Sequence, residues 1–231
     1  KLEGCFYTIF TPFDKFGQID FETLEKYIEK LYAGGARIFY VMAYNSRYSQ
    51  LSNEEIFTLN EFCCRTVKSL SPDNVIIVGD PIHCDTKTSI EYSRHARDCG
   101  ADLISLLFRE KFFCEDQVLD HFAEVGSKSK MAIMVHEMPF LSGYDGTQMH
   151  WPKTLLSSLT KVPHIFALKE DAKVAEITIA ALTLEPSIRV VIAGSKSSLL
   201  KYRDHGVKAY LNGISMIDAR IGELFWKAFS D

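Results

Sequence analysis

The sequence repeats one alternation eight times: a short apolar run, then a stretch with helical periodicity. The apolar runs have the character of buried strands and lie at residues 6–10, 38–43, 75–79, 103–107, 132–136, 165–169, 189–193 and 209–211. The stretches that follow them are expected helices at 21–33, 53–70, 86–99, 115–127, 153–159, 174–183, 197–205 and 219–229. Short strands that alternate with helices predict βαβ units and a parallel sheet.

Eight such units in succession, without a long linker, predict a closed (β/α)8 TIM barrel that forms one domain over residues 1–231. Local signals agree, because Ser52 and Glu55 have the spacing of a capping box. Gly34, Gly100 and Gly206 stand where helices are expected to end. An open doubly wound sheet would usually carry a glycine-rich phosphate turn after its first strand, whereas "FTPFDKFG" follows that strand here. The barrel is therefore favoured.

Charge and cysteine usage exclude several classes of protein. The net charge is −4 and no Lys/Arg cluster is present, so we expect no nucleic-acid partner. No apolar run approaches the roughly eighteen residues that span a bilayer, and "KLEGCFYTIF" resembles neither a signal peptide nor a transit peptide. The six cysteines form no C-x-x-C pair, which indicates a reducing, cytoplasmic protein without a metal site.

A barrel fold places active-site residues at the C-terminal ends of the strands. The residues at or just after these ends are Thr11, Tyr44, Asn45, Asp80, Phe108, Arg109, His136, Glu137, Lys169, Glu170, Gly194, Ser195 and Asn212. Lys169, in "HIFALKEDAK", is the strongest candidate among them, because burial lowers the pKa of an amine and a neutral amine attacks ketones to form a Schiff base. The alternatives are a lysine that reaches solvent or one that pairs with Glu170.

Three segments together resemble the dihydrodipicolinate synthase/N-acetylneuraminate lyase family of pyruvate-dependent class I aldolases. They are "TIFTPFDKFGQIDFETLEKYIEKLYAGGARIFYVMAYNSRYSQLSNEE", "IMVHEMPFLSG" and "ALKEDAK", and "VVIAGSKSS" and "HGVKAYLNGIS" follow in the family's order. The resemblance extends over essentially all 231 residues. Family members usually continue into further C-terminal helices that these residues do not include.

The resemblance implies roles for individual residues. Lys169 would be the Schiff-base lysine, Thr11 would belong to the loop after the first strand, and Gly194 to a loop lining the pocket. Leu211, with Asn212, would help to wall the pyruvate site. No cofactor or metal is implied. The family also commonly assembles as a homotetramer, so we expect a tetramer or a dimer.

The departures from the family pattern bear on substrate and mechanism. His136 stands where the family has its proton-shuttle tyrosine; an imidazole can relay protons at neutral pH, and a purely structural histidine is the alternative. At the place of the family's pyruvate-carboxylate loop, Tyr44 could supply a hydroxyl, Asn45 an amide donor and Arg47 a carboxylate clamp. Equally, Tyr44 could fill the pocket and Arg47 could face solvent.

Further departures leave the second substrate open. Leu141 replaces the arginine that binds the second substrate's carboxylate in the synthases, which argues against dihydrodipicolinate synthesis. Glu170 and Asp171 could be acid/base groups, although caps for the following helix are the preferred interpretation. The segment 80–85 resembles a metal site only faintly, and Asp85 is better explained as the cap of the next helix.

The sequence therefore predicts a carbon–carbon lyase or aldolase that acts on pyruvate or a related 2-oxo acid and an aldehyde through Lys169, with His136 or Tyr44 moving the proton. The alternative is a barrel without turnover that binds a small metabolite or serves as a non-catalytic subunit. A salt bridge between Arg47 and Glu170 across the mouth would favour that alternative.

Overall fold

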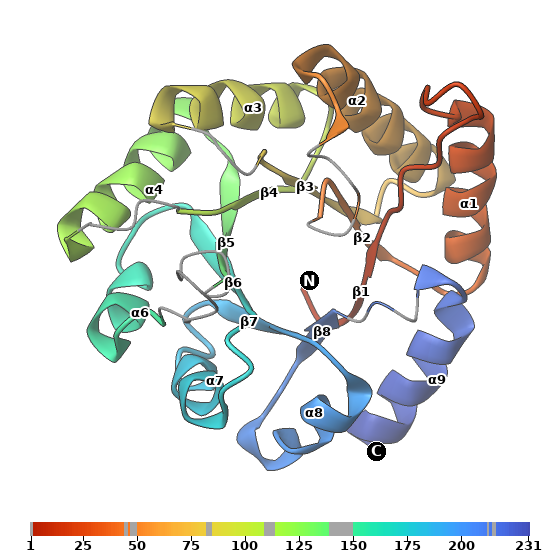
Figure 1. Ribbon diagram of the computed structural model, residues 1–231. Helices are drawn as coiled ribbons and strands as arrows, with labels where there is room; N and C mark the ends of the chain where they lie inside the picture. Colours follow the sequence, from red (N-terminus) through yellow and green to blue (C-terminus); the bar gives the residue numbers. More distant parts are fainter. Residues whose placement is uncertain are drawn as a thin grey trace.

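Eight parallel strands close into a barrel in the order in which they occur along the chain (Figure 1). The computed structural model describes residues 2–43, 46, 50–81, 85–108, 114–138, 150–211, 213 and 216–231. The strands are β1 (Gly4–Thr8), β2 (Ile38–Val41), β3 (Val75–Gly79), β4 (Leu103–Leu106), β5 (Ala132–Glu137), β6 (Ile165–Glu170), β7 (Arg189–Ala193) and β8 (Ala209–Leu211). The predicted (β/α)8 barrel is confirmed.

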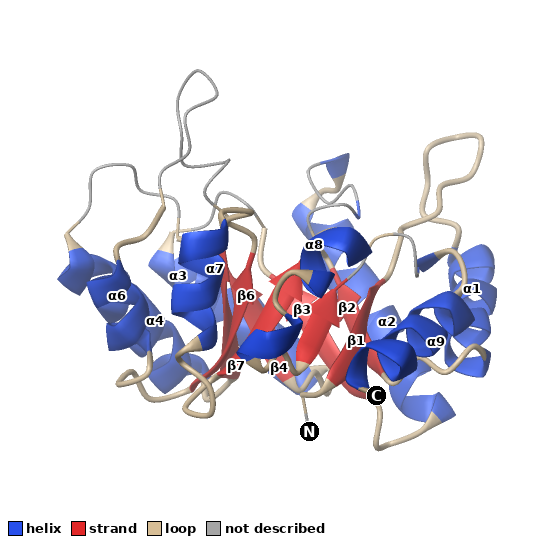
Figure 2. Ribbon diagram, turned by 90° about the horizontal axis from the view of Figure 1, so that it is seen from below, coloured by secondary structure: helices blue, strands red, loops and turns tan. Residues whose placement is uncertain are grey.

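The helices form a ring outside the strands (Figures 1 and 2). They are α1 (Phe21–Ala33), α2 (Asn53–Leu70), α3 (Thr86–Asp98), α4 (Glu115–Ser129), α6 (Lys153–Leu159), α7 (Ala175–Leu182), α8 (Lys196–Leu200), the 3-10 turn Arg203–His205 and α9 (Ala219–Ser230). Within the described ranges, no helix is long and apolar enough to cross a membrane.

Helix α9 closes this ring between α8 and α1, so the last helix packs against the first strand (Figure 1). The thiol of Cys5 on β1 donates to the carbonyl oxygen of Gly222 on α9, with 3.4 Å between Sγ and O. The hydroxyl of Tyr7, also on β1, donates to Glu223 Oε1 at 2.6 Å. These contacts join residues more than two hundred positions apart and hold α9 against β1.

Local sequence signals account for the helix boundaries. Ser52 and Glu55 make the predicted reciprocal capping box at the start of α2. The carboxylate of Asp85 caps α3 as expected, since it accepts a hydrogen bond from the backbone N–H of Thr88 at 3.0 Å. The predicted helix over residues 197–205 is only partly correct, because α8 ends at Leu200 and a separate 3-10 turn follows.

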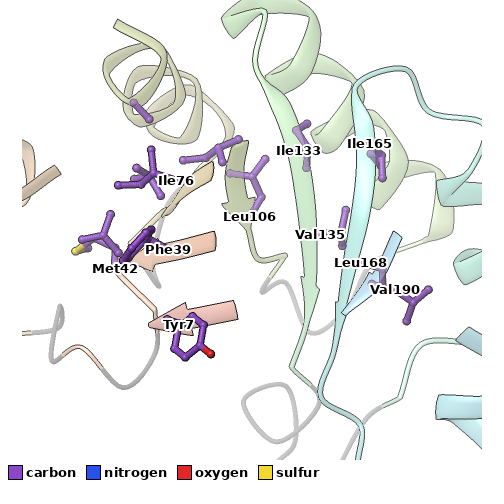
Figure 3. Packing of buried hydrophobic residues seen from close by; sticks show 14 of the residues in the cluster. Tyr7, Phe39, Met42, Ile76, Leu106, Ile133, Val135, Ile165, Leu168 and Val190 are labelled. Carbon is purple, nitrogen blue, oxygen red and sulfur yellow. The ribbon is translucent and has the colours of Figure 1, made fainter. Parts of the chain in front are cut away.

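Alternation along each strand divides the barrel into two apolar layers. One set of side chains fills the bore and includes Phe6, Tyr40, Met134, Ala167, Val191 and Leu211. The other set points outward and packs under the helices; Figure 3 shows part of it, including Phe39, Ile133, Val135, Leu168 and Val190. Residues in the same register and on the same face of neighbouring strands are therefore brought into contact.

A one-residue bulge in β6 sets the register in which β6 pairs with β5. Ile133 on β5 pairs with Ile165, but the next residue, Met134, pairs with Ala167, so Phe166 has no partner in the ladder. The side chain of Phe166 is 57% exposed. Beyond the bulge, His136 pairs with Lys169 and both lie on the bore side, two positions after Met134 and Ala167 respectively. Without the bulge, His136 would face Leu168.

Candidate active site

Lys169 lies in the bore near the C-terminal end of β6, flanked in register by His136 on one side and Val191 on the other. The residue is 5% exposed. Burial lowers the pKa of its amine, while the charge of Asp171 and a hydrogen bond to it oppose part of that shift. The alternative of a lysine that reaches solvent is therefore wrong: this amine is held inside the barrel.

His136 contacts that amine directly. Its Nε2 atom is 2.5 Å from Lys169 Nζ, and the residue is 2% exposed. At this distance one nitrogen must donate and the other accept, because two cationic groups in a dry bore would repel each other strongly. The pair therefore carries at most one positive charge: an ammonium donates to a neutral imidazole, an imidazolium donates to a neutral amine, or both groups are neutral.

Asp171 completes the cluster from the loop after β6. Its Oδ2 atom is 3.1 Å from Lys169 Nζ and 3.5 Å from His136 Nε2. Burial alone would raise the pKa of Asp171, but the charges of Lys169, His136 and Lys173 and a hydrogen bond from His136 outweigh it and hold the pKa well below its usual range. Asp171 is thus an anion between two potential cations.

The preferred expectation that Glu170 and Asp171 cap the next helix is wrong. Helix α7 begins after Val174, and no side chain caps it. Asp171 turns toward the bore instead, and Glu170 accepts hydrogen bonds from Ala172 N at 2.6 Å and Thr178 Oγ1 at 2.9 Å. Lys169 pairs with Asp171 rather than with Glu170, which points to the opposite face of the strand.

Two glutamates lie on the helix side of the same strands, on the face opposite to Lys169 and His136. Glu137 and Glu170 occupy paired register positions on β5 and β6. Burial raises the pKa of Glu137 to about 7, and the charges of Glu170 and Asp171 add to the shift, although a hydrogen bond from Trp151 N opposes it. Glu137 Oε2 is buried without a hydrogen-bond partner among the described residues. The sequence placed Glu137 at a strand end but assigned it no role.

Gly194 and Leu211, both predicted from the family pattern, are adjacent at the ends of β7 and β8. The backbone N–H of Gly194 donates to the carbonyl oxygen of Leu211 at 3.4 Å, and the Tyr210 hydroxyl donates to the Gly194 carbonyl oxygen at 2.8 Å. Gly194 has φ 137°, and a Cβ there would meet nothing within 4 Å. The position is therefore open in space but restricted in backbone conformation.

Of the other residues that were predicted to contact substrate, Thr11 is described by the structure. Thr11 follows β1, is 9% exposed, and its Oγ1 has no hydrogen-bond partner in the described part of the chain. Tyr44, Asn45 and Arg47 lie outside the described residues, as does Leu141. The salt bridge between Arg47 and Glu170 that would favour a barrel without turnover therefore involves a residue outside the described ranges.

Tyr40 is a bore residue that its sequence position, inside a strand rather than at its end, did not single out. It lies on β2, is 2% exposed, and its hydroxyl donates to Ser105 Oγ on β4 at 2.9 Å. The alternation of bore and helix-facing positions in Ile38–Val41 would have placed this hydroxyl inside the barrel. The contact brings two polar groups together in an otherwise apolar part of the bore.

A cavity of about 430 Å³ adjoins the cluster on the helix side, above the ends of β6 and β7. Glu170 and Lys173 form one wall, and Gly194, Ser195, Ser198 and Lys201 contribute to the other. Lys173 also approaches Asp171, with 3.5 Å between Nζ and Oδ1, so it connects the cavity with the cluster. In the described ranges, no group of three or more His, Cys, Asp or Glu residues is arranged to hold a metal ion.

The model of the dihydrodipicolinate synthetase family matches residues 1–230 of the chain. The chain belongs to this family. It is 28% identical over 181 residues to 4-hydroxy-tetrahydrodipicolinate synthase of Alkaliphilus oremlandii, which covers 76% of the chain and 59% of that protein. It is 24% identical over 209 residues to the synthase of Bacillus subtilis, covering 90% of the chain and 69% of that protein.

Solved structures show the same fold. A dihydrodipicolinate synthase of Acinetobacter baumannii, crystallised with pyruvate, superimposes with a TM-score of 0.86 at 19% identity and covers 100% of this chain and 76% of its own. N-acetylneuraminate lyase of Fusobacterium nucleatum gives a TM-score of 0.84 at 15% identity, covering 99% and 76% respectively. The chain thus spans about three quarters of these structures and 59% of the Alkaliphilus relative.

Proposed function

We propose that the protein is a carbon–carbon lyase of class I aldolase type, in which Lys169 forms a Schiff base with pyruvate or a related 2-oxo acid. The observation that carries the proposal is the contact between Lys169 Nζ and His136 Nε2 at 2.5 Å inside a buried bore. A buried amine beside a base can lose its proton at neutral pH, which is what a nucleophilic lysine requires. Membership of a family of lyases supports the same chemistry.

In the first stage, His136 accepts a proton from the Lys169 ammonium, and the imidazolium is balanced by Asp171 at 3.5 Å. The neutral amine adds to the ketone carbon of the 2-oxo acid. The imidazolium then returns its proton to the departing oxygen, which leaves as water with one hydrogen from the amine. The sum of these steps converts an ammonium and a ketone into a protonated iminium and water.

In the second stage, the iminium accepts electrons from the neighbouring carbon. Loss of a proton from that carbon gives an enamine, which attacks the aldehyde; in the reverse direction, the carbon–carbon bond breaks and leaves the same enamine. A base must accept or return one proton in either direction, and His136 is the described residue placed to do so. Tyr44 remains the alternative proton carrier. Hydrolysis of the iminium regenerates Lys169.

The remaining predicted residues would hold the substrate. We assign the carboxylate of the 2-oxo acid to Asn45 and Arg47, with Thr11, Gly194 and Leu211 forming the wall of the pocket. Among the described residues the buried Oγ1 of Thr11 has no hydrogen-bond partner, which supports a contact with substrate because a buried hydroxyl without a partner is costly. We also propose a cytoplasmic homo-oligomer, and five free cysteines in the described residues are consistent with a reducing compartment.

The proposal is tested by borohydride reduction of the protein with and without pyruvate, followed by peptide mass spectrometry. We expect a pyruvate-dependent adduct on Lys169 and none on the Lys169→Ala variant. Lys201→Ala, which removes an exposed lysine on the cavity wall, controls for nonspecific amine modification. Absence of an adduct with pyruvate and with a panel of 2-oxo acids would overturn the proposal and leave the binding-only barrel as the better account.

A further inference from the structure

Asp171 contacts both nitrogen atoms of the proposed reaction centre, although it lies outside the strand that carries Lys169. Its Oδ2 atom faces Lys169 Nζ at 3.1 Å and His136 Nε2 at 3.5 Å. The Asp171 side chain is 12% exposed, and those of Lys169 and His136 are 6% and 1% exposed. The three groups therefore interact with little screening by water.

We propose that Asp171 is a positioning residue of this site: it holds the His136 imidazole against the Lys169 amine and supplies the counter-charge for the proton that the two share. The inference rests on the proposed Schiff-base function and adds a third residue to it. Asp171 belongs to the loop that leaves β6, so its backbone has no ladder hydrogen bond that would force the side chain into the bore. In the bore, the side-chain oxygen Oδ2 of Asp171 contacts both nitrogens.

Charge balance through the reaction explains why a fixed anion would be useful here. The centre holds one positive charge at every stage, first as the ammonium, then as the imidazolium and finally as the iminium. A carboxylate within 3.5 Å of both nitrogens can balance each form without moving. In a dry bore, an uncompensated charge is costly.

Lys173 contributes to the same arrangement from the solvent side. Its Nζ atom is 3.5 Å from Asp171 Oδ1, the oxygen that does not face the reaction centre, and its side chain is 59% exposed. The two oxygens of Asp171 thus have separate partners, one set inside the bore and one at its edge. Glu137 and Glu170 are the other acidic groups that influence this centre from β5 and β6.

The test compares the wild-type protein with Asp171→Asn, which keeps the shape of the side chain and removes its charge. The rate of pyruvate adduct formation is measured from pH 5 to 10 by rapid mixing and borohydride quench. Asp73→Asn, an exposed aspartate on the loop before β3, is the matched control. Circular dichroism and a urea midpoint establish that each variant is folded.

We expect two changes in Asp171→Asn. The midpoint of the pH–rate profile moves down by at least about one pH unit, because the loss of the anion destabilises the protonated pair. On the alkaline plateau, where the amine is neutral in both proteins, the limiting rate falls about tenfold or more, since the imidazolium that protonates the leaving oxygen is less stable. The pyruvate concentration that gives half the limiting rate changes less than about threefold.

The conservative variant Asp171→Glu is expected to recover part of the wild-type midpoint and part of the wild-type rate. It also replaces Asp171→Asn in the test if that variant fails to fold. A midpoint within about 0.3 pH unit of wild type would overturn the inference even if the rate falls, because a merely structural role slows the reaction without moving its pKa. If the wild-type protein forms an adduct and Asp171→Asn has the same pH–rate profile, only the role of Asp171 fails. If the wild-type protein forms none, the Schiff-base function fails with it.

Discussion

Lys169 faces His136 because Phe166 is left out of the ladder between β5 and β6. The bulge shifts the pairing by one residue, and the shift places an amine and an imidazole on the same face of neighbouring strands, 2.5 Å apart. Bulges are common next to active sites, where they redirect a side chain. The contact between Lys169 and His136 is thus a consequence of backbone register as much as of residue identity.

His136 is expected to be required for efficient adduct formation. His136→Asn removes the proposed base for the Lys169 proton and keeps a polar side chain in the bore. We expect the rate of borohydride-trapped adduct formation with pyruvate at pH 7 to fall by about 10²-fold or more. His205→Asn, in an exposed turn, is the matched control and should react as wild type does. A rate within about threefold of wild type for His136→Asn would return the histidine to a structural role.

Glu137 is expected to make the protein less stable as the pH rises. Its pKa is about 7 in the fold and 4.5 in the unfolded chain, so the folded state favours the neutral carboxyl. Stability from this group is fully present below pH 4.5 and is lost as the pH rises toward 7. Glu137→Gln cannot ionise and can still accept the hydrogen bond from Trp151 N.

We therefore expect Glu137→Gln to raise the free energy of unfolding at pH 8 by about 1–3 kcal/mol and to leave it nearly unchanged at pH 4.5. Urea unfolding at both pH values measures the difference. The exposed substitution Glu176→Gln is the control and should change little at either pH. A Glu137→Gln variant that is less stable than wild type at pH 8 would contradict this prediction.

His121 is expected to destabilise the protein in acid. Burial lowers its pKa from 6.5 to about 4, its Nδ1 atom is 3.0 Å from Thr86 Oγ1, and its Nε2 has no hydrogen-bond partner among the described residues. Stability from the neutral ring is present above pH 6.5 and is lost as the pH falls toward 4. When the pH is lowered from 7 to 4, the free energy of unfolding of His121→Leu should fall by about 1–3 kcal/mol less than that of the wild-type protein. Parallel slopes for the two proteins would exclude this contribution.

A side chain at Gly126 is expected to destabilise the fold, although Gly126 lies within helix α4, where alanine has the higher intrinsic helix propensity. A Cβ at this position would lie 2.7 Å from Cβ of His164, in the segment that leads into β6. We expect Gly126→Ala to destabilise the fold by about 1–3 kcal/mol, because the clash exceeds the gain in helix propensity. Thermal unfolding checks this against Ser127→Ala, a neighbouring exposed position that should be nearly neutral. A stabilised Gly126→Ala variant would show that the segment at His164 moves freely.

Periodicity and capping residues alone determined most of the barrel. The predicted bounds of α1, α2, α6, β3, β7 and β8 match the structure. The other elements differ by one or two residues at their ends, except that the predicted helix over 197–205 is the shorter α8 followed by a 3-10 turn. These features depend on neighbours within a few positions, so a single sequence contains them. The position of Lys169 at a strand end followed from the same pattern. The resemblance to the family located Gly194 and Leu211, which the structure joins by a backbone hydrogen bond.

Only the tertiary structure decided what surrounds Lys169. Asp171 was interpreted as a helix cap because acidic residues near a helix start usually are, but α7 begins later, and the carboxylate instead faces two nitrogens in the bore. Glu137 became notable only when β5 paired with β6 and buried it beside Glu170. Burial and charge depend on which strands meet and in which register. A local sequence pattern does not contain that information, because the bulge at Phe166 is a feature of the pairing between β5 and β6, which lie about thirty residues apart in the sequence.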